Sequence, residues 1–127
     1  MTEYEFFNLL NGTKPILSDG AMGTMLHEHG ISFEKCFDEL NLTNPAVVAE
    51  IHKAYIDAGS QIILTNTFGA NRFKLTRHGL ESSLQKINAG AVDLARRVVA
   101  ASFKHVLVAG DVGPLGAHLA PFGRVQP

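Results

Sequence analysis

Three short apolar segments, separated by two helix-like segments, constrain the fold of this 127-residue chain more than any other feature. The segments are PILSD (15–19), QIILTNTF (61–68) and HVLVAGD (105–111). They are rich in β-branched residues and do not alternate strictly, which is typical of strands buried in a parallel sheet. The order strand, helix, strand, helix, strand predicts right-handed βαβ units and therefore an α/β fold.

The two long helices have recognisable ends. The first is predicted to begin at Asn44, an N-cap residue followed by proline, and to end at Gly59. The second is predicted to begin at SSLQ (82–85), whose serine and glutamine have capping-box spacing, and its Gly90 predicts close packing. The expected buried faces are Val47, Val48, Ile51, Ala54, Tyr55 and Ala58 in the first helix and Leu84, Ile87, Ala91, Leu94 and Val98 in the second. A short helical piece is expected in AMGTMLHEHG (21–30).

Composition excludes several classes of protein. With 46% hydrophobic and 18% charged residues the chain is typical of a soluble globular domain, and its net charge of −1 argues against nucleic-acid or membrane-surface binding. No apolar run approaches the roughly 18 residues of a membrane helix, and the N-terminus lacks a secretory signal. The single cysteine, Cys36, cannot form an internal disulfide. These features predict a cytoplasmic protein.

A sheet of three parallel strands has two open edges and too few helices to cover its faces. We therefore expect residues 1–127 to form the first part of a larger α/β domain. The exposed edges also predict self-association of the isolated chain.

Polar residues and glycines follow each predicted strand. Asp19 and Gly20 follow the first strand, the TNT triplet (65–67) follows the core of the second, and Asp111 follows the third. Ligands bind at the carboxyl ends of parallel strands, so these residues are candidates for a binding site. The alternatives are that Asp19 and Gly20 only form a turn, and that Asn66 and Thr67 only cap the next helix.

No metal site is predicted from the histidines or from Cys36. His27 and His29 are two residues apart in a probable helix, so they point to different faces and cannot easily share an ion. The other four histidines lack ligand-like spacing, and each is interpreted as a surface or helix-end residue: His52, His78, His105 and His118. Cys36 has no second cysteine with which to bind zinc and is interpreted as a partly buried structural thiol.

Three segments taken together resemble the opening of the homocysteine S-methyltransferase domain family. They are LSDGAMGTML (17–26), CFDELNLTNPAVVAEIHKAYIDAGSQIILTNTFGAN (36–71) and VAGDVGPLG (108–116), so the resemblance is strongest over residues 15–116. It implies that the chain forms the first three βα units of a (β/α)8 TIM-type barrel of roughly 300 residues, truncated after the third strand.

The resemblance also implies a reaction, in which a methyl group is transferred to the zinc-activated thiol of homocysteine to give methionine. The family holds Zn²⁺ with three cysteines that this chain lacks, so the isolated chain is expected to be inactive and to contain no catalytic or metal-binding residue. The methyl donor is not determined, and cobalamin or folate would be bound by other modules. A non-catalytic half-barrel that works by association is the alternative, and a different α/β enzyme is a more distant one.

Carried over residue by residue, the resemblance makes Asp19 the partner of the homocysteine ammonium group. The backbone of Gly20 and Ala21 would face the substrate carboxylate, and the rim of the site would include Thr65, Asn66 and Thr67. Asp111 departs from the small residue expected at its position. It is either a second acid at the mouth of the site or a harmless loop variant.

Overall fold

The structure is a computed structural model that describes residues 2–127. Its elements, in chain order, are α1 (Glu3–Leu10), α2 (Met22–Glu28), α3 (Leu40–Thr43), α4 (Pro45–Ala58), β1 (Ile62–Leu64), α5 (Arg72–Thr76), the 3₁₀ turn η1 (Glu81–Ser83), α6 (Leu84–Ser102) and β2 (Leu107–Ala109). Helices α5 and α6 lie between strands β1 and β2 in the chain and form a βαβ unit with them, so the predicted α/β class is confirmed.

Strands β1 and β2 are parallel, with Ile62, Ile63 and Leu64 paired to Leu107, Val108 and Ala109. The predicted first strand is reduced to one parallel bridge, between Ser18 and Ile62. Since Ile62 also pairs with β2, segment 17–19 lies along the other side of β1, which is therefore central. All three strands are shorter than predicted, and only Ile63 of β1 is buried.

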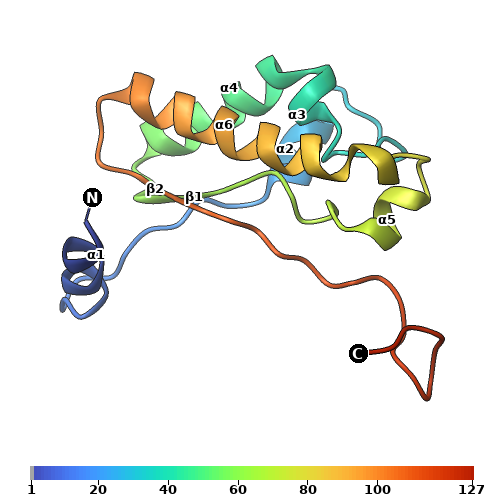
Figure 1. Cartoon of the computed structure of the whole chain (residues 1–127). Helices are drawn as coiled ribbons and strands as arrows, with labels where there is room; N and C mark the ends of the chain where they lie inside the picture. The colour runs from blue at the N-terminus through green and yellow to red at the C-terminus, as the bar shows by residue number, and fades with distance from the viewer. Residues whose placement is uncertain (1) are drawn as a thin grey trace.

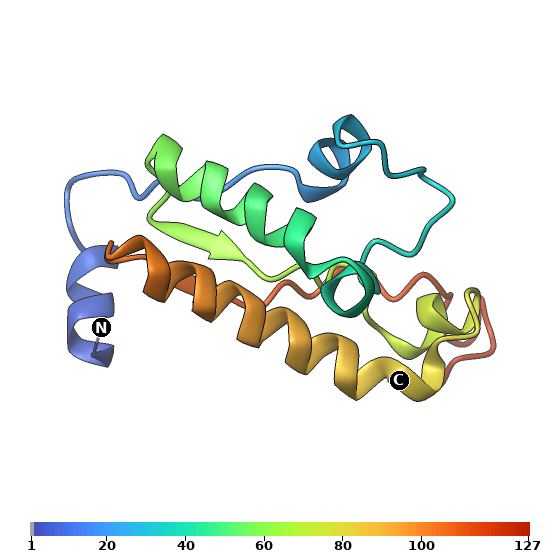
Figure 2. The same cartoon turned by 90° about the horizontal axis from the view of Figure 1, so that it is seen from above.

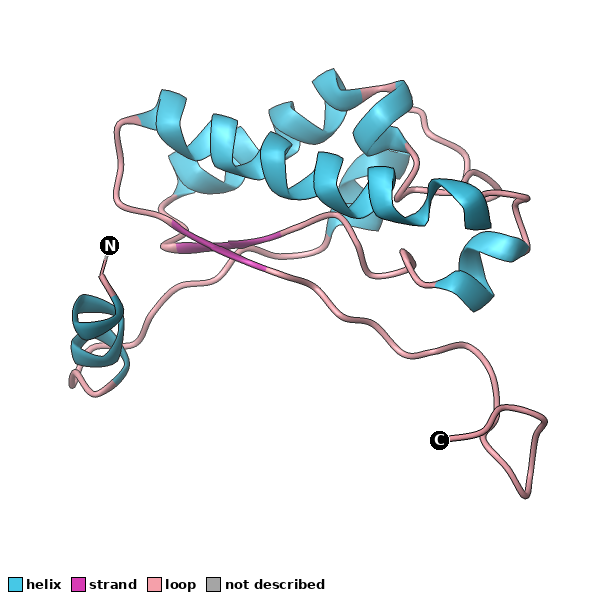
Figure 3. Ribbon diagram, viewed as in Figure 1, coloured by secondary structure: helices cyan, strands magenta, loops and turns pink. Residues whose placement is uncertain are grey.

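The helices α2, α3, α4 and α6 lie on one side of the strands, whereas the other side is bare in this part of the chain (Figures 1 and 3). Helices α4 and α6 run side by side over the strands (Figure 2). Helix α1 lies apart from this layer and contains no buried residue. The segment after β2 runs away from the layer as a loop that ends at Pro127.

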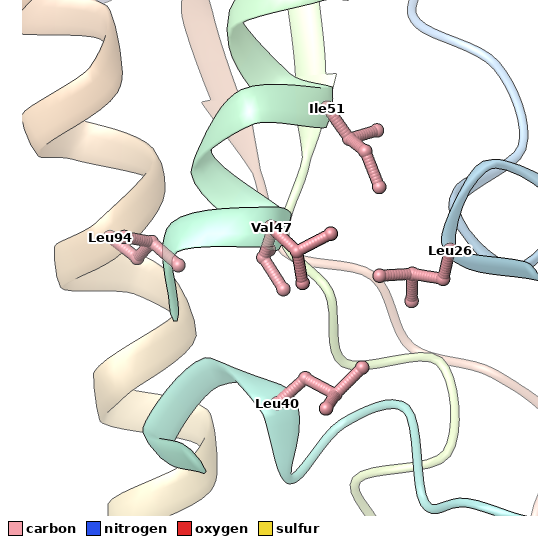
Figure 4. Packing of buried hydrophobic residues seen from close by; sticks show 6 residues of the cluster. Leu26, Leu40, Val47, Ile51 and Leu94 are labelled. Atoms are coloured by element: carbon pink, nitrogen blue, oxygen red, sulfur yellow. The ribbon is translucent and has the colours of Figure 1, made fainter. Parts of the chain in front are cut away.

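The core lies between the helices and the strands. Its largest cluster joins four helices through Leu26, Leu40, Val47, Val48, Ile51 and Leu94 (Figure 4). A second cluster joins α5 to α6 through Leu75 and Ile87, and a third packs α4 against β1 through Ile56 and Ile63. The strands are thus covered by apolar side chains on one face only, and this face is set by the helices.

Helix α4 ends as predicted, since Gly59 has φ +111° in the left-handed region that favours glycine. Its buried face is rotated from the prediction: Ala54 and Ala58 are exposed, whereas His52 and Ile56 are buried. The rotation follows from packing on both α6 and β1, which buries residues on more than one side of the helix. The Asn44 side chain makes no capping hydrogen bond.

The start of α6 differs from the prediction, because residues 81–83 form a 3₁₀ turn and no side chain caps the helix. The predicted capping box at 82–85 is therefore wrong. The close packing predicted at Gly90 is confirmed, because a Cβ atom there would lie 2.8 Å from Cδ2 of Leu42. Helix α3 approaches α6 across this glycine.

Candidate functional site

The residues that follow the three strand segments surround one cavity of about 650 Å³. Six of the seven predicted site residues line it: Asp19, Gly20, Ala21, Thr65, Asn66 and Asp111. Thr67 does not line the cavity, although it was expected at the rim. The cavity has the size range of small-molecule sites and lies at the carboxyl ends of the strands, where parallel α/β folds bind ligands.

Asp19 lies beside the end of β1. Its Oδ2 accepts a hydrogen bond from the backbone N–H of Leu64 at 2.9 Å, and its Oδ1 accepts one from the Ser18 hydroxyl at 3.3 Å. Burial raises the pKa of the Asp19 carboxyl above its ordinary value. The two hydrogen bonds lower this pKa in part, whereas the negative charge of Asp111 raises it further. An ammonium group at this position would relieve the cost of keeping the carboxylate charged in a half-buried place.

The turn after Asp19 is held by α4. The Tyr55 hydroxyl donates a hydrogen bond to the carbonyl of Ala21 at 2.7 Å. A Cβ atom on Gly20 would lie 3.0 Å from the same hydroxyl, so a side chain there would displace Tyr55. Gly20 thus allows the close approach that fixes the turn at the edge of the cavity.

A buried hydroxyl pair ties the end of β1 to the end of β2. The hydroxyls of Thr65 and Thr67 lie 2.7 Å apart, and Thr67 donates to the carbonyl of Asp111 at 2.8 Å. The backbone N–H of Asp111 donates to Thr65 Oγ1 at 3.1 Å. Thr67 therefore positions the backbone of Asp111 from behind, which explains why its own side chain does not reach the cavity.

Asn66 is buried and links three segments. Its Nδ2 donates to the carbonyl of Phe37 at 2.8 Å and to Oδ1 of Asn41 at 3.2 Å, while Asn41 donates to the Asn66 carbonyl at 2.7 Å. Neither Asn66 nor Thr67 caps the next helix, so that alternative is wrong. The cap of α5 is Asn71, whose side chain accepts from the N–H of Lys74 at 3.0 Å.

Sequence reasoning missed Asp38, which lines the same cavity and is buried. Its Oδ1 accepts a hydrogen bond from the N–H of Gly69 at 2.9 Å, and burial raises the pKa of its carboxyl. The thiol of Cys36 lies 3.8 Å from Oδ2 of Asp38 and is itself buried, which confirms Cys36 as a buried thiol. No local pattern distinguished Asp38 from Glu39 beside it in the CFDEL segment (36–40).

The cationic wall of the cavity was also missed. Lys74, Arg77 and His78, on α5 and the residues just after it, line the cavity together with Phe68. Lys74 Nζ lies 4.5 Å from the centroid of the Phe68 ring, and Phe68 is 56% exposed. The cavity is therefore bordered by the carboxylates of Asp19 and Asp111 at the strand ends and by the cations of Lys74 and Arg77 on the α5 side.

The surface or helix-end interpretation is wrong for His52, which is fully buried in α4. Neither ring nitrogen has a hydrogen-bond partner within residues 2–127, and burial lowers the pKa of this histidine to about 4. His52 does not line the cavity.

The residues of this chain do not fit a zinc site. Within residues 2–127 there is no group of three His, Cys, Asp or Glu side chains that could hold a metal ion. The Cys36 thiol has only the Asp38 carboxylate beside it, which is two ligands short of the usual four. Across the same residues, no helix is long and apolar enough to cross a membrane.

A parallel α/β layer with a cavity at the strand ends, lined by apolar side chains and a few charged ones, defines a ligand-binding α/β domain. Comparison with known proteins identifies its family. The homocysteine S-methyltransferase family model matches residues 16–127, so the chain belongs to this family. It is 33% identical over 121 residues to the homocysteine S-methyltransferase of Escherichia coli K12, and 31% identical over 120 residues to the methionine synthase of Mycobacterium leprae.

Solved structures agree with this family. The metallated form of the homocysteine methyltransferase MmuM from Escherichia coli superposes with a TM-score of 0.74 at 30% identity over 85% of this chain, and the oxidised form with a TM-score of 0.77 at 29% identity over 87%. The chain spans 41% of each of these structures. It spans 39% of the E. coli homocysteine S-methyltransferase and 10% of the M. leprae methionine synthase.

Proposed function

We propose that this chain supplies the amino-acid-binding side of the site of a homocysteine S-methyltransferase, which methylates homocysteine to methionine. The observation that carries the proposal is Asp19, a half-buried carboxylate fixed at the end of β1 and facing a cavity large enough for a small zwitterion. Family membership supports homocysteine as the substrate. The Asp19 carboxylate would bind the ammonium group of homocysteine. The backbone of the turn at Gly20 and Ala21 would face the carboxylate of homocysteine.

The fold part of the proposal is that segment 17–19, β1 and β2 are the first three strands of a (β/α)8 barrel. The parallel order with β1 in the centre agrees with sequential strand addition around such a barrel. The bare face of the strands would then face the barrel interior, opposite the layer formed by α4 and α6. Residues outside this chain would supply the remaining units.

The proposal leaves thiol activation to residues outside this chain. The described residues do not provide the ligand set that zinc requires, so Asp19, Thr65 and Asp111 act here only to bind and orient the amino acid. We accordingly propose that the chain alone does not catalyse methyl transfer.

Asp19→Asn tests the proposal. The amide keeps an oxygen for the N–H of Leu64 but removes the charge, and a charge-assisted hydrogen bond contributes on the order of 1.5–3 kcal/mol. Homocysteine affinity, measured by calorimetry, should fall about ten- to a hundredfold. Asp57→Asn is the matched control, since Asp57 is an exposed acid on α4 paired with Lys53. Unchanged homocysteine binding with lowered thermal stability would make Asp19 a turn residue only.

A further inference from the structure

The α5 side of the cavity carries the positive charges of Lys74 and Arg77, neither of which forms an ion pair within residues 2–127. Lys74, Arg77 and His78 all line the cavity, and within residues 2–127 neither Lys74 nor Arg77 has a carboxylate within 4.0 Å. The three ion pairs in this part of the chain involve other residues. The charge of Lys74 lowers the pKa of the Asp38 carboxyl in the same cavity, but the two side chains form no ion pair, so the ammonium group of Lys74 and the guanidinium of Arg77 can still bind an anionic ligand.

The loop after β2 holds these cations in place. Arg77 donates from Nη2 to the carbonyl of Gly116 at 2.7 Å, and its side chain makes no other hydrogen bond within residues 2–127. Gly116 has φ +78°, and a Cβ atom there would lie 3.2 Å from both Cγ and Cε of Lys74. The loop thus packs against the Lys74 stem and anchors Arg77.

Phe68 fixes the other end of Lys74. The ammonium group lies 4.5 Å from the centroid of the Phe68 ring, which limits how far it can swing away from the cavity. Asn71 caps α5 and also donates to the carbonyl of Pro114 at 3.4 Å, so helix and loop are joined at a second point. Side chains held in this way lose little entropy when a ligand binds.

We propose that Lys74, Arg77 and His78 form a carboxylate-binding subsite on the α5 wall of this cavity. The inference deepens the proposed function and rests on it for the identity of the cavity as a substrate site. The bound carboxylate belongs to one of two sources. It is either that of a second small molecule, the methyl donor, which shares the cavity while the homocysteine carboxylate faces Gly20 and Ala21, or that of homocysteine itself, which then lies on the α5 wall instead of at this turn. Both sources present the same planar anion, which matches the fork of an arginine side chain.

Two matched probe pairs separate these sources. The first is homocysteine and its decarboxylated analogue, and the second is glycine betaine and choline, in which a hydroxymethyl group replaces the carboxylate. Calorimetry measures binding of each probe to the wild-type chain and to Lys74→Gln and Arg77→Gln. Arg72→Gln is the control, since Arg72 is an exposed cation on the same helix that does not line the cavity.

Both cavity variants should lower the affinity for one carboxylate-bearing probe about five- to tenfold and leave the affinity for its carboxylate-free counterpart unchanged. Arg72→Gln should change neither affinity. The affected pair identifies the source of the carboxylate. Thermal unfolding checks that each variant is folded. If Arg77→Gln disorders the loop after β2, Lys74→Gln still tests the subsite, because it keeps the hydrogen bond from Arg77 to Gly116.

The inference is overturned if both members of each pair lose affinity equally, if neither changes, or if the wild-type chain binds none of the four probes. Absence of homocysteine binding by the wild-type chain contradicts the proposed function. Loss of homocysteine affinity in Asp19→Asn, with unchanged affinities in the Lys74 and Arg77 variants, contradicts the subsite alone.

Discussion

Asp38 accepts a hydrogen bond from the backbone N–H of Gly69 at 2.9 Å, which joins the segment before α3 to the segment after β1. The two residues also fit against each other, because a Cβ atom on Gly69 would lie 2.5 Å from Oδ2 of Asp38. Both line the cavity, so this contact fixes one part of its wall.

Asp38→Ala should lower the free energy of unfolding by about 1–3 kcal/mol, because it leaves the Gly69 N–H without a partner in a part-buried place. Asp38→Asn should have a smaller effect, since the amide oxygen can still accept this hydrogen bond. Gly69→Ala should also be destabilising, because Asp38 must move. Urea unfolding at pH 7 measures all three, and an Asp38→Ala variant as stable as the wild type would contradict the prediction.

His52 should make stability depend on pH. Its pKa is about 4 in the folded protein and about 6.5 in an unfolded chain, so the unfolded state binds a proton first as the pH falls. This contribution is absent well above pH 6.5 and destabilises the fold increasingly as the pH falls towards 4. Between pH 8 and pH 5 the expected loss is about 2 kcal/mol.

His52→Leu should remove this part of the pH dependence and raise stability at both pH values, because two buried nitrogens without partners are replaced by apolar atoms. The measurement is the urea midpoint of wild type and variant at pH 5 and pH 8. His105→Leu is the control, since His105 is exposed. Equal pH dependence in wild type and His52→Leu would show that another group is responsible.

The Cys36 thiol should react slowly with disulfide reagents and should not hold zinc. Burial raises the pKa of Cys36, so little thiolate is present near neutral pH. Reaction with a chromogenic disulfide should be slow in the folded chain and fast in urea. Metal analysis of the dialysed chain should find no stoichiometric zinc, whereas one zinc per chain that is lost in Cys36→Ser would refute this.

The isolated chain should self-associate as its concentration rises, because apolar side chains lie exposed in the strand segments and in the loop after β2. Leu17 is 55% exposed and Val112 is 93% exposed. Sedimentation velocity should show association that Val112→Lys reduces. Val92→Lys on α6 is the control, and a monomer at all concentrations would contradict the prediction.

The fold class was predictable because it depends on local patterns. The apolar runs, the proline after Asn44 and the glycine after Ala58 gave the order of elements and the ends of α4. Which residues of α4 are buried was not predictable from the sequence of this helix alone, because it depends on packing against elements far away in the chain. His52 and Ile56 are buried because α4 contacts both α6 and β1, which a single apolar stripe does not reveal.

The candidate site divides in the same way. Asp19, Thr65 and Asp111 follow apolar runs directly, so the sequence alone determined that they lie at one edge of a parallel sheet, and family resemblance was likewise carried by residue order. The roles of Thr67, Asp38 and the α5 cations were decided only by the tertiary structure. Their partners lie far away in sequence, as Thr67 and Asp111 or Arg77 and Gly116 show. A hydrogen bond across such a separation exists only once the chain has folded, and no local pattern specifies it.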